Sequence, residues 1–324
     1  MSISAGETEA LICAFRLRAV TPLGMEALGA EPTEDDPVWL HFNLFDNRAR
    51  RYLEHASIDE DGRALLLGAE GRIKAIGFEG GFAALFGDLH HDFDGDPDSF
   101  GTLRVYVDAR RIITCRKQRV RSLDRVRREL QRGSSGKTPM LLFDQVLEQI
   151  AAGFADAAEE LGDTVETAED RVLAGRADDE SRELGRVRRV IARLRRYTSA
   201  DRIALSQLAH RVGSLCDEEQ RARLHDVIER FDATGQDLEL VSERARLLQE
   251  EIASRLGEAT NKNLYLLSIV TTALLPITLV TGVFGMNVGG LPFVASEHGF
   301  WWVMFGMLLV VLGTLFLLRR RRVF

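Results

Sequence analysis

Two long apolar runs near the C-terminal end of the chain constrain its fold more than any other feature. Leu264–Phe284 contains no charged residue, and neither does Phe300–Leu318. A helix needs about 20 apolar residues to cross the hydrocarbon core of a bilayer, and both runs are about that long. The sequence therefore predicts two transmembrane helices, over 264–284 and 300–318.

The charges that flank these runs predict their orientation. Arg255 and Lys262 precede the first run, and the short connection 285–299 contains no Lys or Arg. A basic tail over 319–324 follows the second run and contains Arg319, Arg320, Arg321 and Arg322. Because basic flanks stay on the cytoplasmic side, we expect both termini in the cytoplasm and only the loop 285–299 outside. The arginines of the tail would then form a basic ring at the inner end of the spans.

Composition and one apparent motif bear on possible partners. The 324 residues carry a formal net charge of −7, which disfavours nucleic acid as a partner. The segment Gly133–Pro139 contains a Gly-Lys-Thr sequence typical of phosphate-binding loops. That motif requires a glycine where Gln131 stands and a strand before it, whereas a helix is expected here. We therefore expect neither a nucleic-acid nor a nucleotide partner.

The first part of the chain, 1–121, reads as an α/β domain in the cytoplasm. Short apolar segments separated by polar turns predict strands over Leu11–Leu17, Val38–Asn43, Leu65–Leu67, Ile73–Phe78, Leu103–Val107 and Arg111–Lys117. The last two are joined tightly enough to form a hairpin. Short helices are expected over Arg48–His55 or Phe82–Leu89.

Long helices are expected from residue 122 onward. A helical region over 122–216 contains two helices, Thr138–Leu173 and Ser181–Ser214, which would form an antiparallel hairpin; Thr138 followed by Pro139 is a typical helix start. A stalk over 217–263 then continues into the first span without a proline before Pro276. One helix from Asp217 to Phe284 would be roughly 100 Å long. Its apolar stripe needs neighbours, which predicts an oligomer.

One face of the first span alternates polar and apolar residues. Positions three and four apart share a helix face, and this face contains Asn261, Leu264, Ser268, Thr271, Leu275, Thr278 and Gly282. Hydroxyl groups in a membrane helix often serve only packing. A pore lined by identical helices would use the same hydroxyls to contact water and the leucines to narrow the path. We favour the pore face over simple packing.

Two further groups of residues are candidate cation sites. In the cytoplasmic part, His90, His91, Asp92, Asp94 and Asp96 lie close together in sequence, but Pro97 occupies the position where a calcium-binding loop starting at Asp92 requires glycine. This segment is either a weak sensing site or a solvated acidic turn. In the external loop, Glu297 and His298 would attract cations or exchange protons, or else form ordinary polar surface.

The connection after the first span resembles a known family. Gly285, Met286 and Asn287 reproduce the Gly-Met-Asn signature of the CorA superfamily of divalent metal transporters. Pro276 and Thr278 in the first span, two spans near the end and a basic cluster after them are also similar to that family. The continuation Val288-Gly289-Gly290-Leu291-Pro292 resembles the ZntB zinc-transporter branch more than typical magnesium transporters, which carry acidic residues after the asparagine.

The resemblance implies an α+β membrane protein that assembles as a CorA-like homopentamer in the bacterial inner membrane. The first span would line the pore, and Gly285, Met286 and Asn287 would form the selectivity filter at its outer mouth. Neutral amide oxygens of Asn287 can accept hydrogen bonds from the waters of a hydrated ion without removing them, since small divalent ions lose water reluctantly.

The function implied by the resemblance is transport, not catalysis, and needs no cofactor. We expect uptake of Zn²⁺ into the cytoplasm, coupled to protons, with Mg²⁺, Co²⁺, Ni²⁺ and Cd²⁺ as further candidate ions. A Mg²⁺ or Co²⁺ channel of the CorA type is the alternative within transport. A membrane-tethered helical scaffold or sensor, in which the spans only anchor the stalk, is the alternative of another class.

Overall fold

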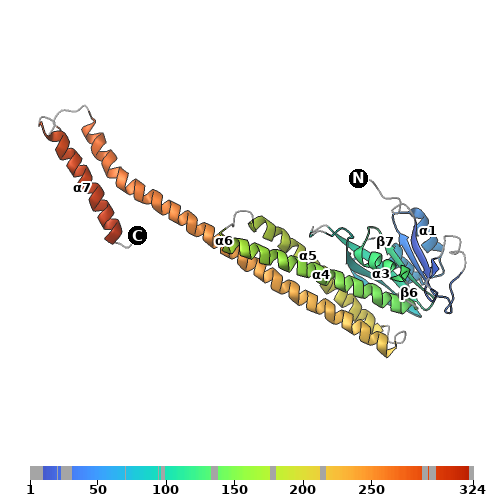
Figure 1. The fold of residues 1–324 in the computed structure, drawn as a ribbon. Helices are drawn as coiled ribbons and strands as arrows, with labels where there is room; N and C mark the ends of the chain where they lie inside the picture. Colours follow the sequence, from blue (N-terminus) through green and yellow to red (C-terminus); the bar gives the residue numbers. More distant parts are fainter. Residues whose placement is uncertain are drawn as a thin grey trace. The chain divides into compact units, whose positions relative to one another are not determined.

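The computed structural model describes residues 10–19, 21–22, 31–69, 71–93, 95, 99–132, 138–175, 180–211, 217–286, 291 and 297–320 (Figure 1). The chain divides into two compact units, 1–249 and 250–324. The longest helix, α6 (Glu218–Phe284), contributes to both.

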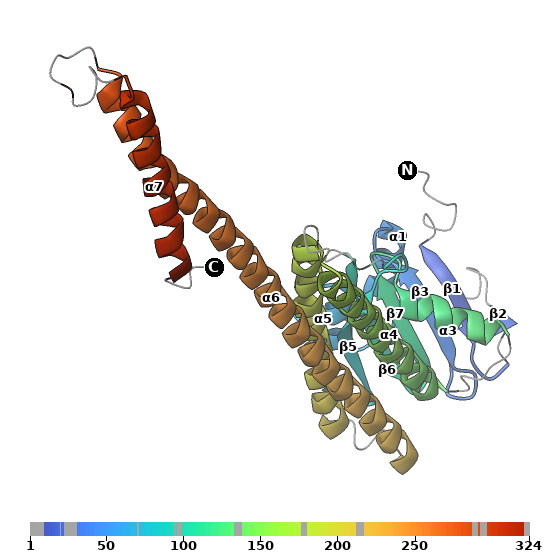
Figure 2. The same cartoon turned by 60° about the vertical axis from the view of Figure 1, so that its left-hand side comes forward.

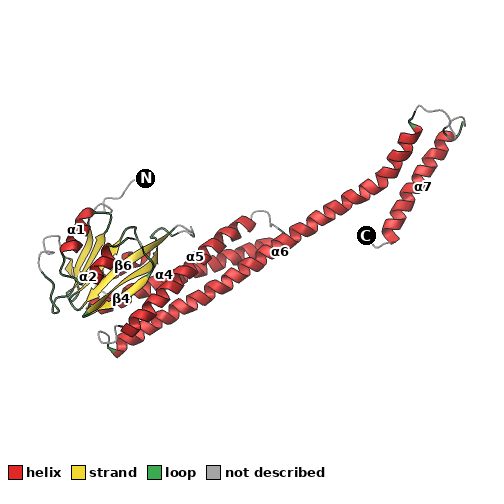
Figure 3. Cartoon of the chain, turned by 180° about the vertical axis from the view of Figure 1, so that it is seen from behind, coloured by secondary structure: helices red, strands yellow, loops and turns green. Residues whose placement is uncertain are grey.

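The first unit is built on a seven-stranded sheet (Figure 3). Its strands are β1 (Leu11–Arg16), β2 (Thr21–Pro22), β3 (Val38–Asn43), β4 (Lys74–Phe78), β5 (Gly81–Leu89), β6 (Phe100–Asp108) and β7 (Arg111–Arg116). Their order is β2-β1-β3-β7-β6-β5-β4, and β3 and β7 pair in parallel while the other neighbours are antiparallel. The predicted hairpin of the last two strands is confirmed. Asp108 Oδ1 closes its turn by accepting the backbone N–H groups of Arg110 and Arg111, both at 2.8 Å.

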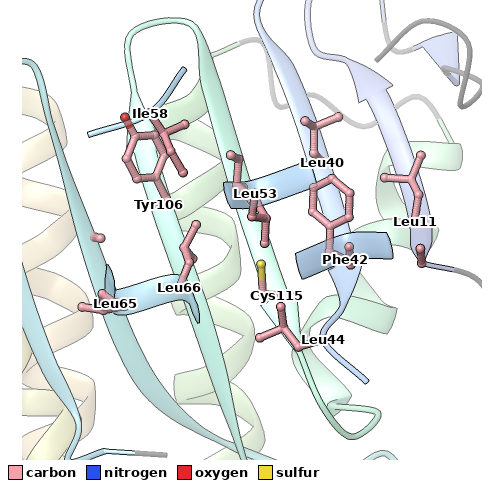
Figure 4. Close-up of a cluster of buried hydrophobic side chains, with 14 of the residues drawn as sticks. Leu11, Leu40, Phe42, Leu44, Leu53, Ile58, Leu65, Leu66, Tyr106 and Cys115 are labelled. Carbon is pink, nitrogen blue, oxygen red and sulfur yellow. The ribbon is translucent and has the colours of Figure 1, made fainter. Parts of the chain in front are cut away.

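One face of the sheet is covered by two short helices, α1 (Asn47–His55) and α2 (Glu60–Leu67). Leu53 and Leu66 from these helices lie in one buried cluster with Phe42, Tyr106 and Cys115 of the strands (Figure 4). Burial of such side chains contributes roughly 1.5–3 kcal/mol each, which fixes the helices on this face.

Two expectations for this region were wrong. Leu65–Leu67 is the last turn of α2, not a strand, because the side chain of Asp59 caps a helix start by accepting the Gly62 N–H at 3.1 Å. Phe82–Leu89 is not a helix but most of β5, in which every residue is buried. A strand covered on both faces has no polar alternation, so its apolar run resembles that of a buried helix.

The opposite face of the sheet packs against α3 (Arg121–Gln131), α4 (Pro139–Leu173) and α5 (Glu180–Arg211). Phe143 of α4 packs edge-on against Phe82 of β5, with ring centroids 4.8 Å apart. The predicted helix start is confirmed, since Pro139 is the first residue of α4 and the Thr138 hydroxyl accepts the Leu141 N–H at 3.2 Å. Helices α4 and α5 contact each other and form the expected hairpin (Figure 2).

The segment from Glu218 to Phe284 is a single helix, as predicted, with Pro276 inside it. Its first part belongs to the first unit and is tied to α4 by Arg223, whose Nε donates to Asp144 Oδ2 at 3.0 Å. Its last part and α7 (Gly299–Arg320) make up the second unit.

Candidate functional site

The last part of α6 is apolar and mostly exposed, and Ile269, Pro276, Val280 and Phe284 are half-buried along one side. Among the residues that the structure describes, α6 is the one helix long and apolar enough to cross a membrane, and none of its most apolar window is buried within the chain. The apolar stretch described in α7, Gly299–Thr314, is shorter. A helix that is apolar on all sides needs a nonaqueous environment or other helices around it. Length and composition thus agree with a membrane segment.

Every residue of the predicted pore face lies on this exposed surface. These residues are Asn261, Leu264, Ser268, Thr271, Leu275, Thr278 and Gly282. The two leucines are large and open, with 56% of Leu264 and 63% of Leu275 exposed. Among the described residues of its unit, no side chain buries this face, so it is available to other copies of the chain or to lipid.

The threonine hydroxyls of α6 donate to the backbone of their own helix. Thr271 Oγ1 donates to Leu267 O at 2.8 Å, and Thr278 Oγ1 donates to Leu274 O at 3.0 Å. Thr272 donates to Ser268 O at 2.7 Å in the same way, although it lies off the predicted face. A hydroxyl that donates its proton still has lone pairs to offer. On the predicted face, these oxygens present acceptors of the kind that water and cations use.

The end of α6 is a close turn of the backbone. The Gly285 N–H donates to Thr281 O at 2.8 Å, and the Met286 N–H donates to Val283 O at 3.3 Å. A Cβ atom on Gly285 would lie 2.9 Å from Thr281 O, closer than side chains tolerate. The first residue of the Gly-Met-Asn signature is therefore held to glycine by sterics. Asn287, Val288, Gly289, Gly290 and Pro292 lie outside the described residues.

The two candidate residues of the connecting loop lie directly before α7. Glu297 and His298 are both exposed, and the carbonyl of His298 accepts the N–H groups of Trp301 and Trp302 at 3.1 and 3.2 Å. His298 therefore has a backbone role at the helix start in addition to any role of its ring. At the other end of α7, the side chains of Arg319 and Arg320 and the whole of Arg321 and Arg322 lie outside the description.

The candidate residues His90, His91 and Asp92 lie beside a strongly basic group. His91 Nδ1 is 3.1 Å from Asp124 Oδ2, and the same carboxylate faces the guanidinium groups of Arg116, Arg119 and Arg127 at 3.3 to 4.0 Å. Burial lowers the pKa of His90. In the described part of the chain, no three His, Cys, Asp or Glu side chains are grouped to hold a metal ion. Asp94 and Asp96 lie outside that part, and a sensing site at His90, His91 and Asp92 stays a prediction.

The first unit contains an acidic groove that was not predicted from the sequence. A groove of about 440 Å³ between α4 and α6 is lined by Asp156, Glu159, Asp163, Glu166 and Asp237. Its signal in the sequence is the spacing of Glu159, Asp163, Glu166 and Asp170, which places four carboxylates on one face of α4.

The fold and the signature after α6 define the class of the protein. A family described as CorA-like Mg²⁺ transporter protein matches residues 34–320. The chain belongs to this CorA-like family and is a divalent cation transporter, a class made up of ion transporters and not of enzymes. The resemblance in the sequence is thereby confirmed.

Individual relatives and solved structures are similar to this chain over most of its length. The divalent cation transporter CmaX of Pseudomonas aeruginosa is 31% identical over 82% of this chain and 81% of its own length. The zinc transport protein ZntB of Yersinia enterocolitica is 28% identical over 90% of this chain and 88% of its own. The structure of full-length CmaX superimposes with a TM-score of 0.83 at 27% identity, covering 96% of this chain and 98% of that one. The CorA magnesium transporter of Methanocaldococcus jannaschii has the same fold, with a TM-score of 0.81 at 18% identity over 95% and 97% of the two chains.

Proposed function

We propose that this chain moves Zn²⁺ into the cytoplasm through a homopentameric pore lined by the last part of α6, with α7 around it in the inner membrane. The observation that carries the proposal is the exposed face of α6 from Asn261 to Gly282, which ends at the close turn of Gly285. The alternation on this face supports a hydrated path, because its hydroxyl oxygens can accept from water while the leucines constrict.

The choice of zinc depends on the residues after Asn287. No acidic residue stands between Val288 and Pro292. Neutral amides at the mouth would select a hydrated divalent ion by its outer waters, and Glu297 and His298 would supply groups for proton coupling. The similarity to ZntB proteins supports this assignment.

A second candidate within transport is a Mg²⁺ or Co²⁺ channel. The family description and the CmaX relative, named for divalent cations in general, favour it. The two candidates differ in ion and in energy coupling, since a channel conducts down its gradient without needing protons.

Metal uptake into proteoliposomes tests the proposal. We expect Zn²⁺ entry that accelerates when the outside is acid and falls by on the order of tenfold in Asn287→Ala, equivalent to about 1.4 kcal/mol. The control Asn47→Ala changes an exposed asparagine of α1 and leaves uptake unchanged. Mg²⁺ entry indifferent to pH would select the channel, and no flux of any divalent ion would select the tethered scaffold.

A further inference from the structure

Helix α5 carries four exposed arginines on one face, and between them Arg193 is half-buried over the ring of Phe100 of β6, 5.8 Å from its centroid. Arg182, Arg186, Arg189 and Arg196 are all exposed and follow one another at four, three and seven residues, which places them on one side of the helix. We call them the arginine stripe. Within the described residues, no ion pair or hydrogen bond engages these four guanidinium groups. The guanidinium of Arg196 lies over the ring of the adjacent Tyr197, 5.8 Å from its centroid.

A different set of α5 arginines faces α6. Arg188 Nη1 donates to Gln249 Oε1 at 2.6 Å. Arg195 lies 3.2 Å from Glu239, and Arg202 lies 3.5 Å from Asp232. These three arginines are seven residues apart and therefore share a face other than that of the stripe. The side chains of α6 thus pair with this second set of arginines and not with the arginine stripe.

Helix α4 carries the complementary charge. Glu159, Asp163, Glu166 and Asp170 are exposed at spacings of four, three and four residues. They lie opposite the buried side of α4, which contains Leu161, Val165 and Ala168. Among the described residues, no ion pair or side-chain hydrogen bond neutralises these four carboxylates. Each helix thus presents a row of unpaired charges at nearly the same repeat.

The groove beside this acidic row has the shape to receive long side chains. It lies between α4 and α6 and has a floor of small residues, Ala155, Ala158 and Gly162. Asp237 of α6 adds a carboxylate on the far wall, and Arg244 is the one cation among the residues that line it. Small residues on the floor leave room for the alkyl stems of arginine, which bury readily beside apolar surface.

We propose that the arginine stripe of one copy docks into the acidic α4–α6 groove of the next copy. The two surfaces belong to different parts of the chain, so the contact is heterologous, and a contact of this kind forms a ring when its repeated rotation closes. This inference depends on the proposed homo-oligomer and adds which surfaces join its subunits. Exposed ion pairs contribute little affinity each, but rows of opposite charge exclude other arrangements and fix the register.

Charge reversal tests the docking on the full-length protein in detergent. Arg186→Glu with Arg189→Glu places acid against acid, and Asp163→Arg with Glu166→Arg places base against base. We expect each double variant to lose the oligomer, measured as mass by native mass spectrometry. Because every subunit contains both surfaces, the fourfold variant restores complementarity, and we expect it to recover the oligomer.

Matched controls separate this contact from a general effect of charge. Arg51→Glu with Arg72→Glu, and Glu54→Arg with Glu79→Arg, change exposed residues elsewhere in the first unit by the same charge. We expect both controls to assemble like the unaltered chain. Assembly of the reversal variants, or failure of the fourfold variant to assemble while its circular dichroism and melting are unchanged, would overturn the proposal.

Cross-linking provides an independent measurement that does not require lost assembly. In a chain whose native Cys13, Cys115 and Cys216 are replaced by alanine, a short bismaleimide should join Arg189→Cys to Asp163→Cys between copies when both changes are in one chain, and should give a ladder of covalent multimers. Each single variant should give none. Absence of the ladder in an assembled oligomer would reject the docking whatever ion the protein moves, and lost metal flux with a normal ladder would reject only the transport proposal.

Discussion

Asp201 of α5 is joined to Gly87 of β5 by a hydrogen bond in which the Gly87 N–H donates to the carboxylate at 2.8 Å. Asp201 is completely buried, and its second oxygen has no partner within the described residues. Burial raises its pKa well above the usual range, and the nearby charge of Asp88 raises it further. The contact therefore attaches the helix layer to the sheet at the cost of a buried carboxyl group.

Replacing Asp201 separates the hydrogen bond from the charge. Asp201→Asn keeps an acceptor for the Gly87 N–H and removes the buried charge, so we expect an unchanged or higher melting temperature at pH 7.5. Asp201→Ala leaves that N–H unpaired, which costs about 1–3 kcal/mol and lowers the melting temperature by several degrees. Differential scanning fluorimetry of the full chain in detergent measures both. Equal melting of the two variants would show that the hydrogen bond contributes nothing.

The stability of the first unit should fall as the pH rises from about 4 to about 7 and then level off. Burial raises the pKa of Asp88 to about 7, although a hydrogen bond from Ser122 opposes the shift. Because the folded pKa lies above the unfolded value of about 3.9, the folded state binds more protons between about pH 4 and pH 7. Stability is then lost with a slope of at most about 1.4 kcal/mol per pH unit for this group. We expect the melting temperature of Asp88→Asn to depend less on pH between pH 5 and pH 7.5 than that of the unaltered chain. An unchanged pH dependence would show that Asp88 is not the group responsible.

Much of the helical architecture could be predicted from the sequence, because residues at or near each helix end determine where the helix begins and stops. Thr138 and Pro139 specify where α4 begins, and the lack of proline before Pro276 predicts one continuous α6. The central strands are harder, because β5 is buried on both faces and its sequence lacks alternation. The parallel pairing of β3 with β7 joins segments about 70 residues apart, and nothing local in either segment encodes it.

The candidate pore face could also be predicted from local sequence. The residues from Asn261 to Gly282 repeat at three and four positions on one helix, so their common face follows from helical geometry alone. The acidic groove could not be predicted in that way. It combines α4 with Asp237 of α6, and only the packing of two helices brings these carboxylates together.

Gly285→Ala should impair transport more than any helical glycine replaced outside the pore face. A Cβ at this position would lie 2.9 Å from Thr281 O, so the turn that presents Met286 and Asn287 must shift. Filters depend on sub-ångström placement, and we expect divalent ion uptake to fall by on the order of tenfold. Gly257→Ala is the control, because its Cβ meets nothing within 4 Å and alanine favours the helix by about 1 kcal/mol. Normal uptake by Gly285→Ala would show that steric crowding does not require glycine at this position of the Gly-Met-Asn signature.

Paired threonine replacements test whether one face of α6 lines the pore. Thr278 and Thr272 make the same hydrogen bond to the carbonyl four residues earlier, at 3.0 and 2.7 Å, but only Thr278 lies on the predicted face. Valine has nearly the shape of threonine and removes the hydroxyl from both sites, so the effect on the helix is matched. We expect Thr278→Val to lower divalent ion uptake into proteoliposomes several-fold, because the path loses an oxygen that accepts from the hydrated ion. Thr272→Val should leave uptake and oligomer mass unchanged. Equal losses in the two variants would mean that the hydroxyls serve helix packing, and that the path of the ion lies along another face.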